Sequence, residues 1–240
     1  MKGCLPGKAK AAKSGQSRPF KETPVPSMSF TRRGLAALAL LAVAAPGLAL
    51  AEPPKPEATT DMAAILAPGT LADLVIGDAN APVAIIEYGS LTCPHCAAFA
   101  KDVLPQLKAA YLDTGKAKLI FREFVRNPLD GAAFSAARCL GDDKALAAID
   151  LLFKEQDKWA FEENQPDPLL AALRPTGLTK DKAMACFSDQ KLLDGLTAAR
   201  DRVGKAFNFT GTPTFIIDGK VYSGELSMDN FNDILKPLVK

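Results

Sequence analysis

The alternation of apolar and polar residues predicts a strand, a helix and a second strand in the first half of the chain. Residues 83–88 (VAIIEY) form a nearly continuous apolar run with β-branched residues, which is typical of a central strand buried on both faces. Residues 96–111 carry apolar side chains at helical spacing, and Pro105 is expected to kink this helix. Residues 118–125 (KLIFREFV) alternate well enough to predict the second strand.

Helical spacing replaces the strand pattern in the middle of the chain. In residues 130–207, Ala, Leu and Lys dominate, and no convincing strand pattern is present. Breaks at Gly141, 164–166 and 175–177 divide this segment into four or five short helices. We therefore expect an inserted, all-helical subdomain.

Strand signals return after residue 207. Residues 214–217 predict a strand, Asp218-Gly219 a hairpin turn and residues 220–222 the returning strand. Ser227 is suited to cap a last helix that ends near Val239.

Without the helical block, the remaining elements have the order βαβ…ββα, which is an α/β arrangement. Residues 71–129 supply its first part and residues 208–240 its second part. In front of them, residues 52–70 are rich in Pro, Ala and Thr and are expected to form a flexible lead-in.

The first 51 residues have the features of a targeting segment. Arg32-Arg33 precede a short apolar run, and Ala51 ends a small-residue cleavage signal, so the mature chain is expected to begin at Glu52. A membrane anchor is less consistent with the sequence, because the apolar run is barely long enough to span a bilayer and a Pro-Gly pair interrupts it. Met28 would begin a compact signal sequence, and the general secretory and twin-arginine routes both remain open.

The net charge of +2 hides an uneven distribution. The first 51 residues hold eight Lys or Arg and one acid, which leaves 21 basic and 26 acidic residues in the rest of the chain. A mildly acidic body gives no electrostatic reason to expect nucleic acid as a partner. The five cysteines include Cys4, which would leave with a cleaved signal, and the remaining even number permits disulfides in an oxidising compartment.

The segment Cys93-Pro94-His95-Cys96 holds two cysteines and the single histidine of the chain. A structural zinc site usually takes four Cys or His ligands from paired clusters, whereas this chain has one cysteine pair and two isolated cysteines, so we expect no metal. A single histidine also leaves no imidazole for a separate Cys–His or Ser–His–Asp arrangement.

Redox chemistry suits this spacing better. Cys93 is expected at the start of a helix, where unpaired N–H groups and the helix dipole favour the thiolate. His95 would act in the same direction if it were protonated or donated a hydrogen bond. Cys96, one turn further on and more buried, would be the resolving cysteine. A purely structural disulfide is disfavoured because so small a loop contributes little entropy.

From Leu71 to Lys240, the sequence resembles the DsbA-like thiol:disulfide oxidoreductases of the thioredoxin superfamily. The resemblance rests on residues 93–96, the helical insertion and residues 211–215 (GTPTF) before the hairpin. It implies a three-layer thioredoxin fold with an inserted helical subdomain.

The resemblance also implies roles for several residues. Pro213 matches the cis-proline that lies against the active-site disulfide, and Thr212 matches the residue whose backbone pairs with a substrate strand. Glu87 matches a buried acid that assists proton transfer, although an acid at a solvated strand end is the alternative. Cys139 and Cys186 correspond to a second pair in some family members. A disulfide between them would contribute roughly 4 kcal/mol in the chain-entropy model, and two free buried thiols are the alternative.

The expected function is that of an exported oxidase, placed in a bacterial periplasm after cleavage near Ala51. It would donate the Cys93–Cys96 disulfide to unfolded or reduced exported proteins, and a membrane quinone-linked protein would reoxidise it. We expect the protein to be a monomer and to need no cofactor other than this redox-active disulfide. An isomerase or reductase of the same fold is the nearest alternative, since a threonine at the position that Thr212 matches recurs in the isomerase branch. Isomerases of this superfamily usually add an oligomerisation domain, and the lead-in after Glu52 is too short for a globular one. A copper-binding or chaperone module is the alternative from another class.

Overall fold

The computed structural model describes residues 53–164 and 166–239. The expected signal segment, the start at Met28, the cleavage near Ala51 and Cys4 lie outside the described residues. A six-stranded mixed sheet has the order β1-β6-β5-β3-β4-β2. Its strands are β1 (Ala58–Thr59), β2 (Leu74–Ile76), β3 (Val83–Gly89), β4 (Ala117–Glu123), β5 (Thr214–Ile217) and β6 (Lys220–Ser223).

The central strand β3 positions the segment that carries the two cysteines. It pairs with β4 in parallel, from Val83 opposite Ala117 to Gly89 opposite Glu123, and with β5 in antiparallel orientation. The remaining pairs, β2 with β4, β5 with β6 and β1 with β6, are antiparallel. The predicted central strand is confirmed, and it is buried on both faces because Ile85 and Ile86 are both fully inaccessible.

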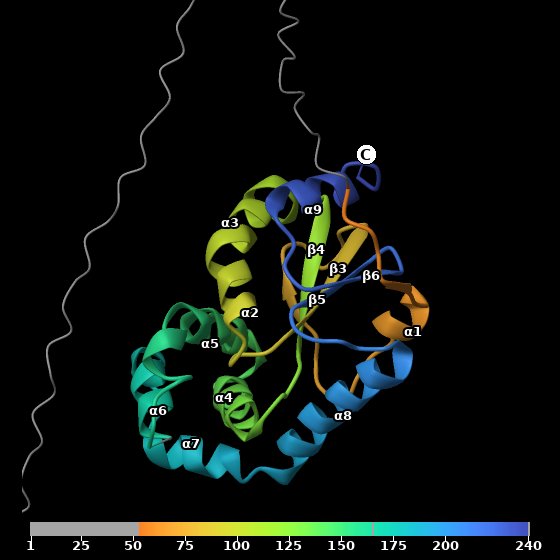
Figure 1. Cartoon of the computed structure of the whole chain (residues 1–240). Coiled ribbons are helices and arrows are strands. Elements are labelled where there is room, and N and C mark those ends of the chain that lie inside the picture. Colours follow the sequence, from red (N-terminus) through yellow and green to blue (C-terminus); the bar gives the residue numbers. More distant parts are fainter. Residues whose placement is uncertain (1–52, 165, 240) are drawn as a thin grey trace, which may run out of the picture. The chain divides into compact units, whose positions relative to one another are not determined.

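Helices cover both faces of the sheet and give it three layers (Figure 1). One face packs against α2 (Pro94–Ala98), α3 (Leu104–Leu107) and α9 (Met228–Leu235), and the other packs against α1 (Met62–Leu66) and α8 (Gln190–Ala206). The alternation of β3 serves both layers, since Ile85 joins the first core and Ile86 the second. This is the expected three-layer α/β arrangement.

The helix after β3 is irregular around Pro105. A π-helical segment, Phe99–Val103, separates α2 from α3, and a second one, Lys108–Leu112, follows α3. Pro105 lies inside an unbroken helical run from Pro94 to Leu112, just after the first π-helical segment, so its missing N–H group interrupts the hydrogen-bond pattern there. The interruption therefore falls where the sequence predicted a distortion.

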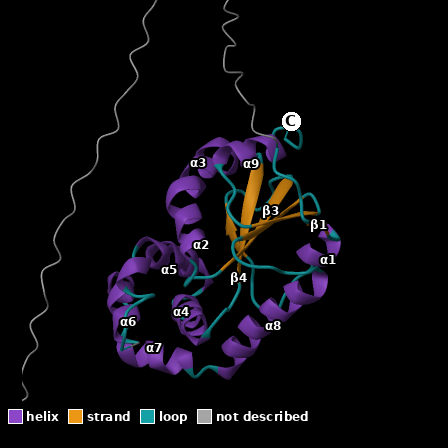
Figure 2. Cartoon of the chain, viewed as in Figure 1, coloured by secondary structure: helices purple, strands orange, loops and turns teal. Residues whose placement is uncertain are grey.

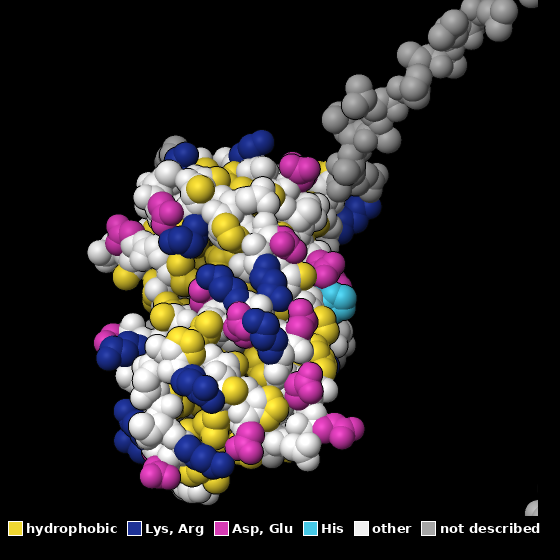
Figure 3. Space-filling model, turned by 90° about the vertical axis from the view of Figure 1, so that its left-hand side faces the viewer, with side chains coloured by type: hydrophobic (Ala, Val, Ile, Leu, Met, Phe, Trp, Pro, Cys, Tyr) yellow, Lys and Arg dark blue, Asp and Glu magenta, His cyan; other side chains and the backbone are white. Residues whose placement is uncertain are grey.

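The helical block comprises four helices before it returns to the sheet (Figure 2). These are α4 (Pro128–Arg138), α5 (Asp142–Lys154), α6 (Asp167–Leu173) and α7 (Lys180–Phe187), with 3-10 turns at Gln156–Lys158 and Arg174–Thr176. The fifth helix, α8, is longer than expected and extends from the block onto the second face of the sheet, where Val203 is fully buried. Within the described residues, no helix is long and apolar enough to cross a membrane. Basic and acidic side chains are interspersed over the face shown in Figure 3.

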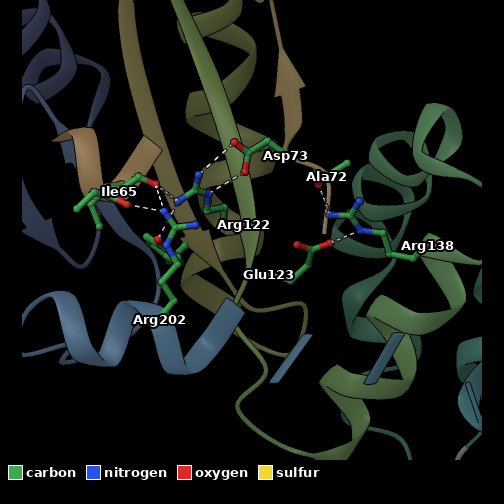
Figure 4. Close-up of polar contacts among 9 residues, drawn as sticks. Ile65, Ala72, Asp73, Arg122, Glu123, Arg138 and Arg202 are labelled. Carbon is green, nitrogen blue, oxygen red and sulfur yellow. Dashed lines mark hydrogen bonds and ion pairs between the residues drawn. The ribbon is translucent and has the colours of Figure 1, made fainter. Parts of the chain in front are cut away.

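The described part of the expected lead-in, residues 53–70, contains a short strand and a helix that its composition did not predict. β1 extends the sheet beside β6, and Ile65 of α1 is 1% exposed. Guanidinium groups hold the backbone of this region: Arg122 Nη1 and Arg202 Nη2 donate to the Ile65 carbonyl at 2.7 and 2.9 Å. Arg138 Nη2 donates to the Ala72 carbonyl at 2.9 Å (Figure 4). Local composition gave no sign of this, because the arginines come from distant elements.

Candidate active site

Cys93 lies at the amino end of α2 as its N-cap residue, directly after the loop that leaves β3. Pro94 occupies the first turn, where its fixed φ suits a helix start. The Cys93 side chain is 3% exposed, and its Sγ lies 3.2 Å from the carbonyl oxygen of Thr212. The expected position of Cys93 at a helix start is therefore what the structure shows.

The pKa values of the Cys93 and Cys96 thiols are shifted in opposite directions. Hydrogen bonding from the Cys96 thiol, a contact with Thr212 and the backbone N–H groups of Cys96 and His95 lower the pKa of Cys93 to about 5. Cys96 is fully buried, and burial followed by its hydrogen bond to Cys93 raises its pKa well above the ordinary value. Cys93 is thus the thiolate near neutral pH and Cys96 the protonated thiol.

Glu87 is a buried acid at the same end of β3. Its side chain is 2% exposed, and its Oε1 atom has no hydrogen-bond partner among the described residues. Burial, followed by the charge of Cys93, raises its pKa to about 8. The Glu87 carboxylate in turn contributes to the raised pKa of Cys96. The alternative of an acid at a solvated strand end is wrong.

His95 is placed differently from expectation. Its ring is 65% exposed, and Nδ1 lies 2.6 Å from Oε1 of Glu225. The hydrogen bond and charge of Glu225 raise the pKa of His95. The backbone N–H of His95 is among the groups that lower the pKa of Cys93, and the charge of Cys93 is a further contribution to the raised pKa of His95. The sequence could not show the contact with Glu225, because Glu225 lies 130 residues further along.

The Thr212–Pro213 peptide bond is cis, and Pro213 directly precedes β5. The Thr212 carbonyl meets the Cys93 sulfur, and the Thr212 Oγ1 atom is buried without a hydrogen-bond partner among the described residues. The structure thus brings residues 212–213 to the cysteines, 119 positions away in the chain.

Asp130, a residue that the sequence did not single out, fixes the loop before Cys93. It is fully buried and accepts hydrogen bonds from the Ser90 hydroxyl at 2.9 Å, the Thr92 N–H at 2.9 Å and the Arg126 N–H at 2.9 Å. Its own N–H group is capped by Asn127. Asn127-Pro128 is a recognisable helix start, but nothing local shows that the next turn reaches the cysteine loop.

Gln156 is a second contact that the sequence did not reveal. Its side chain is 1% exposed, and Nε2 donates to the carbonyls of Leu91 at 2.7 Å and Cys93 at 3.0 Å. The amide comes from the 3-10 turn after α5, so the helical block directly contacts the backbone of the nucleophile.

Cys139 and Cys186 are joined by a disulfide between the end of α4 and α7, with their Cα atoms 6.0 Å apart. The alternative of two free thiols does not apply in this structure, while Cys93 and Cys96 are both free. Within the described part of the chain, no group of three or more His, Cys, Asp or Glu side chains is arranged to hold a metal ion.

The comparisons agree with this geometry. A family model described as thioredoxin matches residues 70–237. The chain belongs to the thioredoxin family. It is 26% identical to α-DsbA1 of Wolbachia pipientis, whose crystal structure superposes with a TM-score of 0.66 over 72% of this chain and 94% of that one. The resemblance to DsbA-like proteins and the expected thioredoxin fold are therefore confirmed.

Curated relatives carry related descriptions. A putative protein-disulfide oxidoreductase of Rickettsia bellii is 35% identical over 148 residues, which cover 61% of this chain and 57% of the relative. Disulfide bond formation protein D of Bacillus subtilis is 24% identical over 181 residues, covering 69% and 77%. The match spans less than two thirds of the length of the Rickettsia relative.

Proposed function

We propose that this protein is a thiol:disulfide oxidoreductase that donates a Cys93–Cys96 disulfide to reduced substrate proteins. The observation that carries the proposal is the opposite shift of the two thiol pKa values. A thiolate at Cys93 stabilises the reduced pair and makes the disulfide a stronger oxidant. It also makes Cys93 the better leaving group when a mixed disulfide is resolved.

The reaction begins when a substrate thiolate attacks Sγ of Cys93. The Cys93–Cys96 bond breaks, Cys96 leaves as a thiolate, and a mixed disulfide joins the substrate to Cys93. Because the pKa of Cys96 is raised, it takes up a proton, and in this scheme Glu87, whose own pKa is raised to about 8, supplies it.

A second substrate thiolate then attacks the substrate sulfur of the mixed disulfide. Cys93 leaves as a stable thiolate, the substrate is oxidised by two electrons and the enzyme pair is reduced by two. The attack is expected at Cys93 because Cys93 lines a surface groove whose lining does not include Cys96. In this scheme, Thr212 pairs with the substrate strand through its backbone, and Pro213 keeps that strand beside the sulfur.

The family resemblance extends the proposal to partners and location. The substrates would be unfolded or reduced exported proteins in a periplasm, and a membrane quinone-linked protein would accept the electrons. No cofactor beyond the redox-active disulfide is required by this scheme. The expected export and the monomeric state stay predictions.

The decisive test is the reduction potential of the pair. It would be measured in glutathione buffers on a Cys139→Ser/Cys186→Ser background, which isolates Cys93 and Cys96. A value well above the roughly −270 mV of thioredoxin, with a Cys93 pKa far below 7 by thiolate absorbance, would support an oxidase. A potential close to that of thioredoxin would instead assign the protein to the reductase or isomerase branch. Absence of exchange with glutathione would favour a binding module.

A further inference from the structure

A groove of about 540 Å³ opens beside Cys93. Cys93, Pro94 and His95 line it together with residues 209–212, which end at the cis-proline. The rest of its lining is Phe124, Arg126 and Arg200, from the segment after β4 and from α8. The groove therefore connects the reacting sulfur with two cationic side chains.

Neither of these arginines has a carboxylate partner among the described residues. The structure pairs other arginines closely: Arg122 contacts Asp73 at 2.9 Å, and Arg138 contacts Glu123 at 2.5 Å. By contrast, Arg126 and Arg200 are exposed and make no ion pair in the described part of the chain. Their positive charges are available to a ligand in the groove.

The aromatic residues of the groove hold Arg200 in place. Its Cζ atom lies 6.0 Å from the centroid of the Phe124 ring, within the range of a cation–π contact. Phe124 stacks on Phe209 with centroids 4.1 Å apart and planes at 24°. Phe209 meets Tyr88 edge-on at 6.3 Å. Because Tyr88 is in the central strand, this end of the groove is formed before a ligand arrives.

Arg126 lies close enough to the cysteine motif for its charge to affect the pKa of His95. The pKa of His95 is raised mainly by Glu225, and the charge of Arg126 is among the opposing contributions. The groups that lower the pKa of Cys93 are hydrogen-bond donors and include neither arginine. Unpaired and at the groove, the two cations are therefore available for contact with a substrate.

We propose that Arg126 and Arg200 bind acidic side chains of the substrate and give the enzyme a preference for cysteines flanked by Asp or Glu. This inference rests on the proposed function, because the ligand is a protein segment whose cysteine reacts with Cys93. Complementary charge near the reacting sulfur speeds encounter and slows release of the noncovalent complex. Arginine suits this task because its planar group can bind a carboxylate through two hydrogen bonds.

The test compares two dithiol peptides that differ only in having Glu or Gln beside the cysteines. At about 0.05 M salt, we expect the oxidised enzyme to oxidise the Glu peptide with a kcat/KM about tenfold higher. Arg126→Gln/Arg200→Gln should reduce that ratio to within about twofold of one, and so should about 1 M salt, where the Debye length is ~3 Å. The ratio within each variant cancels changes in the intrinsic reactivity of Cys93.

Two further variants serve as controls. Arg174→Gln removes an exposed arginine outside the groove, in the 3-10 turn after α6, and should leave the wild-type ratio unchanged. Arg126→Lys/Arg200→Lys keeps both charges and should retain most of the preference. If Arg174→Gln reduces the ratio as much as the groove variants, the preference arises from net charge and the inference is overturned.

The outcomes separate the inference from the proposed function. Equal rates for both peptides with the wild-type enzyme would overturn the inference and leave the oxidoreductase proposal standing. Oxidation of neither peptide would overturn the oxidoreductase proposal. In that case, fluorescence anisotropy with peptides carrying Ser in place of Cys still decides the inference, since binding of the Glu peptide about tenfold tighter than the Gln peptide supports it and equal binding refutes it.

Discussion

The helical block and the sheet both contact the segment that carries Cys93, but they supply different kinds of polar group. From the block, Asp130 accepts three hydrogen-bond donors and Gln156 donates to two carbonyls. From the sheet side, Glu87 in β3 and Thr212 in the segment before β5 each bring a buried oxygen atom without a partner among the described residues.

Paired groups fix the geometry of the loop before Cys93, whereas an unpaired acid can change its protonation state. Burial without a partner is costly, so a fully paired group such as Asp130 stabilises one arrangement of the loop. An unpaired acid can respond to the reaction by gaining or losing a proton, as the raised pKa of Glu87 indicates. We therefore expect substitutions in the block to affect mainly stability and substitutions on the sheet side to affect mainly pH dependence.

The largest effect is expected for Asp130→Asn. The amide keeps one acceptor oxygen but turns an NH₂ group toward N–H donors, so at least one buried N–H of Thr92 or Arg126 loses its acceptor. We expect a loss of about 3 kcal/mol in the free energy of unfolding of the oxidised protein, measured in urea. Asp142→Asn, at a 63% exposed side chain, is the matched control and should cost less than about 1 kcal/mol. Equal losses in the two variants would contradict the role of Asp130.

Glu87→Gln should remove a pH dependence of the free energy of unfolding. The folded pKa of about 8 lies above the ordinary 4.5, so the folded state binds the proton more tightly between these values. The stability from this group is complete below about pH 4.5 and is lost as the pH rises toward 8. Relative to Glu87→Gln, the wild type should lose up to about 1.4 kcal/mol per pH unit in this window.

The measurement is urea unfolding of the oxidised proteins across that window. Oxidation removes the Cys93 charge, so the remaining upward shift comes from burial, and no thiol titrates alongside it. Glu57→Gln changes an exposed glutamate and should run parallel to the wild type. If Glu87→Gln also runs parallel, Glu87 is not the titrating group.

Gln156→Met is expected to have a smaller effect on stability. The substitution keeps the length of the side chain and removes the donor shared by the Leu91 and Cys93 carbonyls. The Cys93 carbonyl still accepts from the Ala97 N–H, so mainly one acceptor is left unpaired. We expect a loss of about 1–2 kcal/mol in urea unfolding. Gln106→Met, at an exposed glutamine that also donates to a backbone carbonyl, should cost under about 0.5 kcal/mol.

The sequence predicted the parts of this site that are contiguous or marked by an unusual residue. The apolar run of β3, the cysteine motif at a helix start and the helical block all follow from local patterns. Glu87 could be suspected because a carboxylate in an apolar run is costly. In each case, the signal lies within a few residues of the feature.

Contacts between distant segments were not accessible in this way. Gln156 looks like any polar residue after a helix, although its amide holds carbonyls 63 and 65 residues earlier. The strand and helix within residues 53–70 were missed for the same reason, since the donors to the Ile65 carbonyl come from β4 and α8. The motif suggested an interaction of His95 with Cys93, but it could not show that the ring also contacts Glu225.

Glu225→Gln should have the smallest effect on stability. The pair of His95 with Glu225 is exposed at both side chains, so neither the block nor the sheet depends on it and no change in the thermal midpoint is expected. The pKa of His95 should fall toward its ordinary value, because the hydrogen bond and charge of Glu225 raise it. As the chain has one histidine, a single imidazole resonance in an NMR titration reports this directly. The reduction potential of Cys93–Cys96 should fall only slightly at neutral pH, since the backbone N–H of His95 still stabilises the Cys93 thiolate and the charge of Cys93 is a lesser contribution to the raised pKa of His95. A large fall in that potential would make the imidazole a main stabiliser of the thiolate.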